Sequence, residues 1–467
     1  MNVIERSPCV GIRKWQATCV EQALIHYETS RHFLCLATPG AGKTTMAAEL
    51  SRRLLEDGKI DFILCFSPSI AVAEGMRLAM SKVLERRFDG IIGAAGCSYT
   101  YQNLLFFKED FWQLFASHNV MVIFDEIHHC SGSEPDNANA WGEEILLNIQ
   151  NQASYTLALT GTPWRSDLAP IVLARYADPD NRIQCDYRYG LRDAIADRVC
   201  RQPKIVLIDN DLISVYSPSE TKNYSSLAEL FNQQEIGYGE LISHPVAIRH
   251  MLSTANQRLR KMREEVPNAA GLVVAASVEH AALITQILAT EMNQQTVLVT
   301  YKTPDAAAQI DKFRSSNAAW IISVGMISEG TDIPRLQICC HLSLIRTELH
   351  YRQVLGRVLR MTNTGPQEGW LYTFAEPELI AFAERISEEI PEQQVLIQEY
   401  HNTGIGSSDQ PLPSHALNTP SDIPRLVWDP QTHKQNTTHK DHDTETTIAS
   451  PFIQLVGKFR EQILATF

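Results

Sequence analysis

The sequence lacks several patterns that would assign it to a familiar class at once. No apolar run is long enough to cross a bilayer, and the opening MNVIERSPCVGIRKW has no apolar core of the kind found in signal peptides. The 10 cysteines include no CxxC pair, so neither a zinc knuckle nor a disulfide framework is indicated. We therefore expect a cytoplasmic protein with reduced, mostly buried thiols.

Basic residues are also scarce. Lysine and arginine number 41 against 54 aspartates and glutamates, which gives a net charge of −13. Because phosphates are contacted by lysine and arginine, this balance argues against a protein that coats nucleic acid through a basic face. It does not argue against a local groove that follows a nucleic-acid backbone, since net charge does not describe local fields.

The 467 residues are enough for two or three domains, and 44% hydrophobic content is typical of a globular chain. Short apolar runs alternate with amphipathic segments in two stretches, which predicts an α/β fold with two tandem parallel-sheet domains. We place the first domain at 1–208, an interdomain connection at 209–240 and the second domain at 241–400. The expected strands are 62–66, 120–124, 156–159, 204–208, 271–276, 296–300, 320–324 and 337–342.

The end of the chain has a different composition. Residues 401–450 are polar and rich in Pro, Thr, Asn, Asp and His, so we expect a flexible linker. Within 451–467 the apolar residues fall on one helical face, which predicts an amphipathic helix. That helix would dock on its own chain or on a protein partner, and the sequence slightly favours the first. The apolar residues are Phe452, Leu455, Val456, Phe459, Ile463 and Phe467.

The stretch LATPGAGKTT, residues 36–45, follows an apolar strand and opens an amphipathic helix. In that context it predicts a phosphate-binding loop: backbone N–H groups surround phosphate oxygens, Lys43 reaches the β and γ phosphates, and Thr44 ligates Mg²⁺. Ala37 stands where the first glycine of GxxxxGK[ST] is expected, which costs little if its φ is negative. The alternative is a glycine-rich turn beside a chance lysine. The expected ATP-binding residues here are Thr38, Gly40, Ala41, Gly42, Lys43, Thr44 and Thr45.

The run VMVIFDEIHHC, residues 120–130, ends a strand in two carboxylates at the edge where parallel sheets bind ligands. Asp125 is predicted to hold Mg²⁺, and Glu126 to orient or deprotonate the water that attacks the γ phosphate. The alternative is an unrelated surface pair. His128 and His129 have a zinc alternative, but no cysteine or histidine cluster would complete that site.

These motifs and their order resemble superfamily 2 helicases, which have paired RecA-like domains and a DExH box. RKWQATCV resembles the adenine-sensing Q motif and implies that Gln16 contacts adenine, with Arg13 or Trp15 assisting. LTGTP, residues 159–163, resembles motif III, which couples hydrolysis to motion. SVGMISEGTDIP, residues 323–334, is similar to motif V, and YRQVLGRVLR, residues 351–360, is similar to motif VI.

The second half of the resemblance implies residues that complete the ATP site from the other domain. Gly330 and Asp332 would lie at the same cleft, the aspartate near the ribose, and Gln353 would contact the nucleotide or link the domains. Arg357 and Arg360 are three apart, so on a helix they share a face, and Gly356 permits close approach to another surface. Arginines supplied from a second domain stabilise charge on the γ-phosphate oxygens, so hydrolysis would require domain closure.

Nucleic-acid contacts are less sharply indicated. FSPS, residues 66–69, resembles motif Ia, and GCSYTYQNL, residues 96–104, resembles the segment that holds motif Ib. In the family these motifs contact a single-stranded nucleic-acid backbone that runs across both domains. The alternative for each serine or threonine is a helix cap. The candidates are Ser67, Thr100, Gln102, Ser277 and Thr300.

We therefore expect an ATP-dependent nucleic-acid helicase or translocase that uses ATP and Mg²⁺ and acts on DNA rather than RNA. One rival is an ATP-gated clamp that separates no strands. Another is a motor subunit of a restriction or phage-defence complex, because DEIHH and SEGTDIP look closest to bacterial members related to RadD and to type III restriction motors. The sequence shows no nuclease constellation, so a nuclease would belong to a partner.

Overall fold

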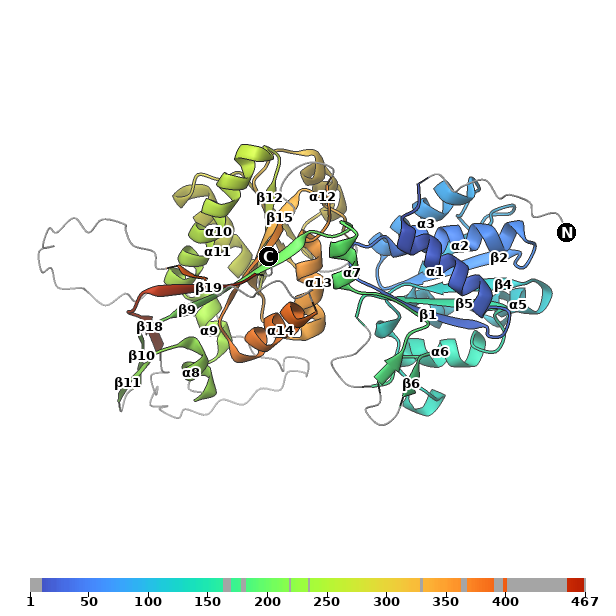
Figure 1. The fold of residues 1–467 in the computed structure, drawn as a ribbon, viewed down its shortest axis with the longest axis horizontal. Helices are drawn as coiled ribbons and strands as arrows, with labels where there is room; N and C mark the ends of the chain where they lie inside the picture. Colours follow the sequence, from blue (N-terminus) through green and yellow to red (C-terminus); the bar gives the residue numbers. More distant parts are fainter. Residues whose placement is uncertain are drawn as a thin grey trace, which may run out of the picture.

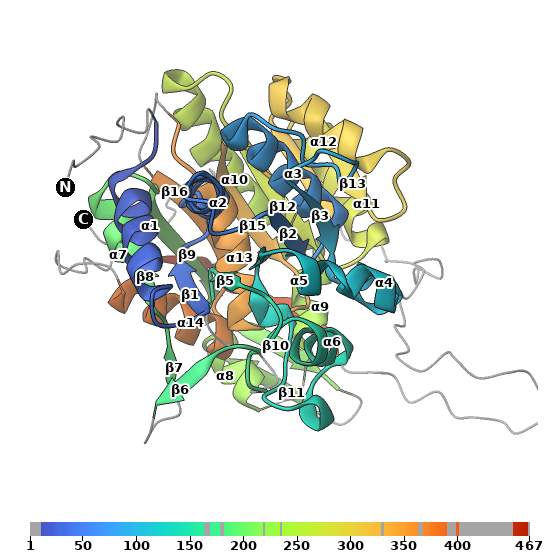
Figure 2. The same ribbon diagram turned by 90° about the vertical axis from the view of Figure 1, so that its right-hand side faces the viewer.

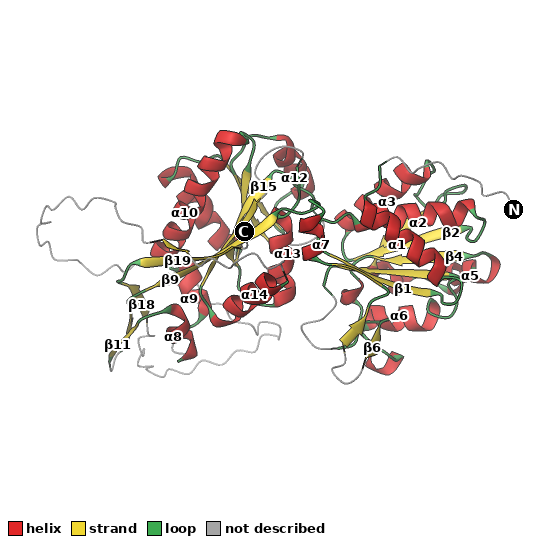
Figure 3. Ribbon diagram, viewed as in Figure 1, coloured by secondary structure: helices red, strands yellow, loops and turns green. Residues whose placement is uncertain are grey.

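The computed structural model describes residues 11–162, 169–177, 182–217, 220–233, 236–327, 331–362, 368–389, 398–400 and 452–465. These residues form two α/β lobes, and helices flank the sheet of each (Figures 1 and 3). The predicted fold class of two tandem RecA-like domains is confirmed. Within the described ranges, none of the helices has the length and apolarity that crossing a bilayer would need.

The first lobe is built on a sheet of six described strands in the order β3-β2-β4-β5-β1-β8, and every neighbouring pair is parallel. Its elements are α1 (Lys14–His26), β1 (His32–Ala37), α2 (Lys43–Glu56), β2 (Phe62–Ser67), α3 (Ile70–Leu84), β3 (Gly96–Thr100), η1 (Tyr101–Phe106), α4 (Glu109–Trp112), α5 (Leu114–Ser117), β4 (Val120–Phe124), η2 (Ile127–His129), η3 (Pro135–Asn137), α6 (Ala140–Asn148), β5 (Tyr155–Thr160), β6 (Arg175–Ala177), β7 (Arg182–Gln184), β8 (Tyr187–Tyr189) and α7 (Leu191–Ala196).

Both faces of this sheet are buried. Successive strand residues point to opposite faces, so Val122 and Phe124 join one core cluster while Met121 and Ile123 join another. Figure 2, turned so that the first lobe faces the viewer, shows α1, α2 and α3 along one side of the sheet and α6 along the other. The strands can therefore be apolar throughout, and polar residues gather where they end.

The second lobe has a sheet of eight described strands in the order β13-β14-β12-β15-β16-β9-β19-β17, in which β19 and β17 are antiparallel to their neighbours. Its elements are β9 (Gln202–Asn210), β10 (Ile213–Tyr216), β11 (Thr221–Tyr224), α8 (Leu227–Asn232), α9 (Tyr238–Ser243), α10 (Pro245–Glu265), β12 (Ala270–Ala275), α11 (Val278–Gln286), η4 (Ile287–Glu291), β13 (Thr296–Thr300), α12 (Ala306–Ser315), β14 (Trp320–Val324), β15 (Leu336–Leu342), α13 (Glu348–Val358), β16 (Glu368–Phe374), α14 (Pro377–Glu388), β17 (Gln398–Tyr400), β18 (Phe452–Leu455) and β19 (Phe459–Ala465).

The predicted domain boundary at residue 208 is wrong. The strand expected at 204–208 is part of β9, which pairs with β16 and therefore belongs to the second lobe. The stretch 209–240 is not a connection either, because β10, β11, α8 and α9 lie within it and belong to the second lobe. The chain passes between the lobes near Cys200, just before β9 begins.

The prediction of an amphipathic helix at 451–467 is also wrong. The described residues form β18, which pairs with β10, and β19, which pairs with β9 from Phe459 to Ala465. Of the apolar residues that suggested a helical face, Phe452 and Leu455 lie in β18, and Phe459 and Ile463 lie in β19. Val456 and the bend at Gly457 lie between the two strands, and Phe467 lies outside the described residues. Docking on its own chain is therefore what this segment does. The predicted linker at 401–450 lies outside the described residues.

Candidate active site between the two lobes

The predicted phosphate-binding loop joins β1 to α2 in the first lobe. Gly40 and Gly42 have φ of 83° and 95°, the left-handed region that glycine tolerates best. Ala37 is the last residue of β1 and is not among the residues with positive φ, so alanine there carries no backbone strain. Lys43 begins α2, and its Nζ donates to Ala37 O at 3.2 Å. The loop thus has the glycine conformations and the lysine placement of a phosphate cradle.

The rest of the loop is held by its own backbone and by β8. Thr38 N donates to Tyr189 O at 3.0 Å, and Ala41 N donates to Thr38 O at 3.1 Å. Thr44 and Thr45 lie half-buried in the first turn of α2. At a helix amino end the first N–H groups are free of intrahelical partners, which suits an anionic ligand.

Gln16 and Arg13, near the start of α1, contact the same loop. Gln16 Nε2 donates to Gly42 O at 2.8 Å, and Arg13 Nη1 donates to Ala41 O at 2.6 Å. Arg13 N in turn donates to Gln16 Oε1 at 2.7 Å, which fixes the glutamine amide. The residues that resemble a Q motif therefore lie against the phosphate-binding loop.

Glu126 lies at the centre of the candidate site. Its Oε1 is 3.0 Å from Lys43 Nζ, and its Oε2 accepts from Gly161 N at 3.0 Å and lies 3.4 Å from His128 Nδ1. Burial opposes ionisation, but the charge of Lys43, His128 and the Gly161 N–H outweigh it and lower the pKa of Glu126 to about 2. Its backbone φ of 52° is unusual for a non-glycine residue and turns the side chain toward this cluster.

Asp125 directly follows β4 and is 7% exposed. Its backbone N donates to Phe66 O at 2.8 Å, and Tyr101 Oη donates to Asp125 O at 2.8 Å, so the turn after β4 is fixed from both sides. A hydroxyl on Thr44 and a carboxylate on Asp125 are the hard oxygen donors that Mg²⁺ prefers. The residue types present therefore fit the predicted metal.

His128 couples this turn to the segment that resembles motif III. It is buried, and its Nδ1 lies 3.0 Å from Thr160 Oγ1, which donates to Thr162 O at 2.7 Å. Glu126 is therefore linked to the end of β5 both through His128 and through the Gly161 N–H.

The second lobe contacts the phosphate-binding loop directly. A Cβ added to Gly356 of α13 would lie 2.7 Å from Pro39 Cβ, and one added to Gly40 would lie 3.2 Å from Arg360 Cγ. Glycine at position 356 thus allows α13 to come this close to the loop, and a side chain at position 40 would require Arg360 to shift slightly. In Figure 1, α13 lies between the two sheets on the side of its lobe that faces the first lobe.

The two predicted arginines lie beside this contact but not on one helical face. Arg357 is buried in α13, and its Nη1 donates to Thr331 O at 2.8 Å. The helix ends at Val358, so Arg360 lies beyond it, where its backbone pairs with Cys200. Arg360 forms an ion pair with Asp332, and burial lowers the pKa of Arg360 to about 10, which leaves it charged at neutral pH.

The other residues predicted to contact the nucleotide are Gln353, Asp332 and Gly330. Gln353 is buried in α13, with 8% of its surface exposed. Asp332 is exposed and pairs with Arg360, and its main-chain oxygen accepts from Arg314 Nε at 2.6 Å. Gly330 lies outside the described residues. The predicted contact of Asp332 with ribose stays a prediction.

Four of the predicted nucleic-acid residues lie at or just after strand ends, and Gln102 lies in η1. Ser67 ends β2 and is fully buried, and its hydroxyl has no hydrogen-bond partner within the part of the chain that is described. Thr100 is the N-cap residue of η1, where its N–H donates to Asn103 Oδ1 at 2.9 Å, and Ser277 Oγ accepts from His280 N at 3.1 Å, so both stand at capping positions. Thr300 Oγ1 accepts from Lys302 N at 3.2 Å, whereas Gln102 is exposed. Capping, the alternative left open above, describes Thr100 and Ser277, and nucleic-acid contact stays a prediction for all five.

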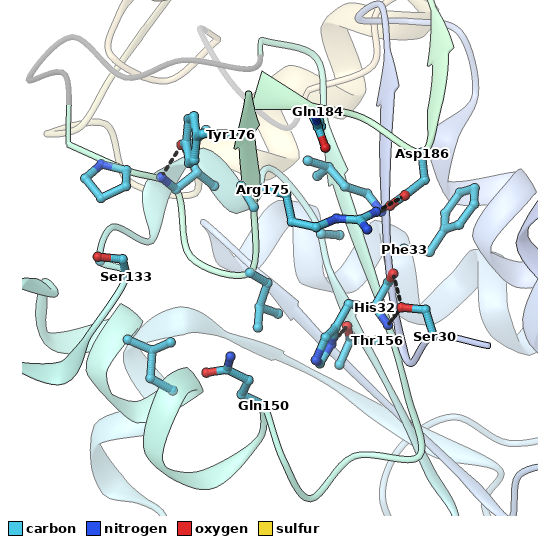
Figure 4. Close-up of a pocket in the computed structure, with 18 residues that line it drawn as sticks. Ser30, His32, Phe33, Ser133, Gln150, Thr156, Arg175, Tyr176, Gln184 and Asp186 are labelled. Atoms are coloured by element: carbon cyan, nitrogen blue, oxygen red, sulfur yellow. Dashed lines mark hydrogen bonds and ion pairs between the residues drawn. The ribbon is translucent and has the colours of Figure 1, made fainter. Parts of the chain in front are cut away.

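A separate cavity of about 240 Å³ lies in the first lobe, away from the phosphate-binding loop (Figure 4). It is lined by residues of β1, β5, α6 and the β6–β7 hairpin. Arg175 and Asp186 form an ion pair on one side, and His32 Nδ1 lies 2.8 Å from Thr156 Oγ1 on another. None of the predicted site residues lines it.

Sequence reasoning missed several residues at the junction. Pro39 of the loop lies against Gly356 of the second lobe, and Cys200 lies against Pro39. Gly161 supplies an N–H to Glu126. The LTGTP segment was a signal for Gly161. Pro39 lies within the predicted loop, but nothing local in the sequence marks its contact with the second lobe or the place of Cys200, because both depend on which segments meet in space.

Comparison with known proteins agrees with this architecture. A family model described as "Type III restriction enzyme, res subunit" matches residues 10–165, and one described as "Helicase conserved C-terminal domain" matches residues 254–362. Together with the paired lobes, these matches identify a superfamily 2 helicase-like protein.

Particular relatives are distant. The uncharacterized protein ML1624 of Mycobacterium leprae is 29% identical over 86% of this chain and 67% of its own length. DNA 3'-5' translocase XPB2 of Sulfurisphaera tokodaii is 23% identical over 77% of this chain and 82% of its own. A fragment described as an HsdR subunit of a type I restriction enzyme from Vibrio vulnificus has a TM-score of 0.55 at 15% identity, over 82% of this chain and 68% of that one. The chain thus spans about two thirds of the length of the mycobacterial relative.

Proposed function

We propose that the chain is an ATP-dependent nucleic-acid motor that hydrolyses ATP between its two lobes and moves along or remodels DNA. One observation carries the proposal: Lys43 and Glu126 of the first lobe and the arginine segment of the second lobe, residues 357–362, all lie at the phosphate-binding loop. The similarity to a DNA translocase supports the choice of DNA over RNA.

In this proposal the residues of the first lobe bind the nucleotide and position the attacking water. Gln16 and the phosphate-binding loop bind the base and phosphates, and Thr44 and Asp125 hold Mg²⁺, which neutralises phosphate charge when bound. Glu126 is a weak base while Lys43 holds its pKa near 2. When Lys43 turns to the phosphates, the pKa of Glu126 rises toward its ordinary value and the carboxylate becomes a better acceptor for the water proton.

The second lobe supplies the remaining positive charge. Arg357 in α13 and Arg360 just beyond its end would stabilise charge that develops on the γ-phosphate oxygens. Hydrolysis then depends on contact between the lobes, which is how chemistry is converted into relative motion.

A steady-state ATPase assay tests this function. We expect turnover by the wild-type chain to increase severalfold with single- or double-stranded DNA, to respond less to RNA, and to vanish in Lys43→Ala, because a positively charged phosphate contact is lost. No ATP hydrolysis with any of the three polymers would contradict the proposal. Hydrolysis that no polymer stimulates would favour the ATP-gated clamp instead.

A second candidate is a motor subunit of a restriction or phage-defence complex, with the nuclease on a partner. The match of residues 10–165 to a type III restriction model favours it. This candidate predicts the same ATPase, but strand cleavage only when a partner chain is added. Cleavage of DNA by the purified chain alone would exclude it.

A further inference from the structure

Arg201, the residue that precedes β9 at the crossing between the lobes, is a fully buried cation that no sequence motif indicated. Its Nη1 donates to Leu336 O at 2.7 Å and to Val358 O at 3.2 Å. Its Nη2 donates to Pro334 O and to Thr362 Oγ1, both at 3.2 Å. One side chain therefore ties the start of β15 to the end of α13 and the residues that follow it.

These acceptors are neutral oxygens, not carboxylates. Burial lowers the pKa of Arg201 to about 10, so the guanidinium remains charged at neutral pH. A buried charge is costly unless hydrogen bonds satisfy it, and a guanidinium offers five donors in a rigid plane that can reach several carbonyls at once. A smaller or neutral side chain could not bridge the same segments.

The segments that Arg201 bridges contain the predicted arginine fingers. Arg201 N donates to Leu359 O at 2.7 Å, and the neighbouring Cys200 forms a backbone bridge with Arg360. Cys200 Sγ also lies 3.8 Å from Pro39 O of the phosphate-binding loop. The segment that crosses between the lobes, residues 200–201, therefore contacts both the phosphate-binding loop and residues 359–360.

We propose that Arg201 is a positioning residue for ATP hydrolysis: it fixes the backbone of residues 357–362 so that Arg357 and Arg360 meet the phosphate-binding loop. The inference rests on the proposed function and names a residue that acts through others. Positive groups stabilise a transition state best when they are held in place beforehand, and small displacements of such groups lower the rate sharply.

Arg335 offers a matched control in the same lobe. It is 5% exposed, burial lowers its pKa to about 10, and its guanidinium also donates to main-chain carbonyls. Its acceptors are Asn268 O at 2.8 Å, Phe313 O at 3.1 Å and Ala318 O at 2.5 Å. None of these acceptors belongs to residues 357–362, so removing the Arg335 side chain disturbs a comparable buried network and leaves the bonds of Arg201 to Val358 and Thr362 in place.

The experiment compares Arg201→Met, Arg201→Lys and Arg335→Met with the full wild-type chain in the presence of the stimulating polymer. It measures kcat, KM for ATP, the melting temperature, and the affinities for ADP and for ADP with aluminium fluoride. For Arg201→Met we expect kcat and the affinity for the aluminium fluoride complex to fall about tenfold, with KM and ADP affinity within about twofold of wild type. Arg201→Lys keeps the charge, so we expect its kcat and its affinity for the aluminium fluoride complex to lie between those of wild type and Arg201→Met.

Arg335→Met is expected to lower the melting temperature while leaving kcat and both affinities within about twofold of wild type. Equal losses of kcat in the two methionine variants, or an unchanged kcat in Arg201→Met, would overturn the positioning role. If Arg201→Met does not fold, the same comparison is made with Arg201→Lys, and an unchanged kcat there overturns it. A wild-type chain that hydrolyses no ATP would instead refute the proposed function itself.

Discussion

Glu126 shows how much chemistry depends on a single residue. Lys43, Gly161 and His128 come from three segments of the first lobe, and all three contact its carboxylate. The sequence indicated Lys43 and Glu126 because each stands in a recognisable local pattern. The Gly161 N–H could not be assigned in the same way, since any residue type supplies a backbone N–H.

Replacing Glu126 with glutamine separates ATP binding from hydrolysis. The amide cannot accept the water proton, so we expect kcat to fall by about 10²–10⁴-fold while the affinity for ATP stays near that of wild type. Rapid-quench hydrolysis and equilibrium binding of a fluorescent ATP analogue measure the two quantities. The charge-conserving variant Glu126→Asp serves as the control. If Glu126→Gln hydrolyses ATP at the wild-type rate, the water-positioning role of Glu126 is refuted.

The same residue predicts how stability depends on pH. The pKa of Glu126 is about 2 in the fold and 4.5 ordinarily, so the folded chain binds this proton less tightly than the unfolded chain. The ionised carboxylate therefore stabilises the fold above pH 4.5, and this contribution disappears as the pH falls toward 2. We expect the difference in unfolding free energy between wild type and Glu126→Gln to shrink by roughly 1–3 kcal/mol between pH 6 and pH 3.

Urea titrations of both proteins at several pH values measure that difference. A constant difference across the range would show that the cluster around Glu126 does not lower the pKa of its carboxyl group. The Lys43→Ala variant provides a further control, because loss of the main opposing charge is expected to flatten the pH dependence in the same way.

Individual elements could be predicted where the signal is local. The bounds expected for β4 and β13, 120–124 and 296–300, are those that the structure has, because both are short apolar runs between polar turns. The apolar residues after residue 451 repeat at helical spacing, which predicts a helix. Its true partner, β9, lies about 250 residues earlier in the chain, and no local pattern shows that pairing.

The turn between β18 and β19 leaves no room for a side chain. A Cβ on Gly457 would lie 2.1 Å from Asp211 Oδ1 and 2.3 Å from Leu212 N. We expect Gly457→Ala to destabilise the second lobe by about 1–3 kcal/mol, because main-chain atoms must move to relieve the overlap. The measurement is the midpoint of chemical unfolding.

Gly237 provides the matched control for this substitution. It precedes α9 and has no atom within 4 Å of the position of an added Cβ, so Gly237→Ala is expected to change stability by about 0.5 kcal/mol or less. Similar midpoints for Gly457→Ala and wild type would mean that the β18–β19 turn does not rest on Asp211 and Leu212 in solution.

At the scale of the whole molecule, the sequence predicted two lobes but misplaced the boundary between them. Residues 204–208 form an apolar run that would suit either sheet, and only its pairing with β16 assigns it to the second lobe. The same limit applies to Arg360. Its place beside the loop depends on the end of α13 at Val358 and on the bridge to Cys200, which are tertiary facts.

Gly356 allows the contact between the lobes to be tested without damage to either. It lies inside α13, and an added Cβ would meet Pro39 Cβ of the other lobe at 2.7 Å. Alanine is favoured over glycine within helices by about 0.5–1 kcal/mol, so Gly356→Ala is expected to leave the melting temperature unchanged or raised. Overpacking at an interface costs about 1–3 kcal/mol, which corresponds to a fall of roughly 5- to 150-fold in kcat if closing the lobes incurs that cost.

Gly75→Ala is the control, because Gly75 also lies inside a helix, α3, but has no atom within 4 Å of an added Cβ. Both variants should therefore gain helix stability, and only Gly356→Ala should lose ATPase activity. Scanning calorimetry and the polymer-stimulated ATPase assay give the two readouts. A Gly356→Ala protein with full activity would mean that hydrolysis does not require α13 to reach the phosphate-binding loop, since the added methyl group acts only on the approach of one lobe to the other.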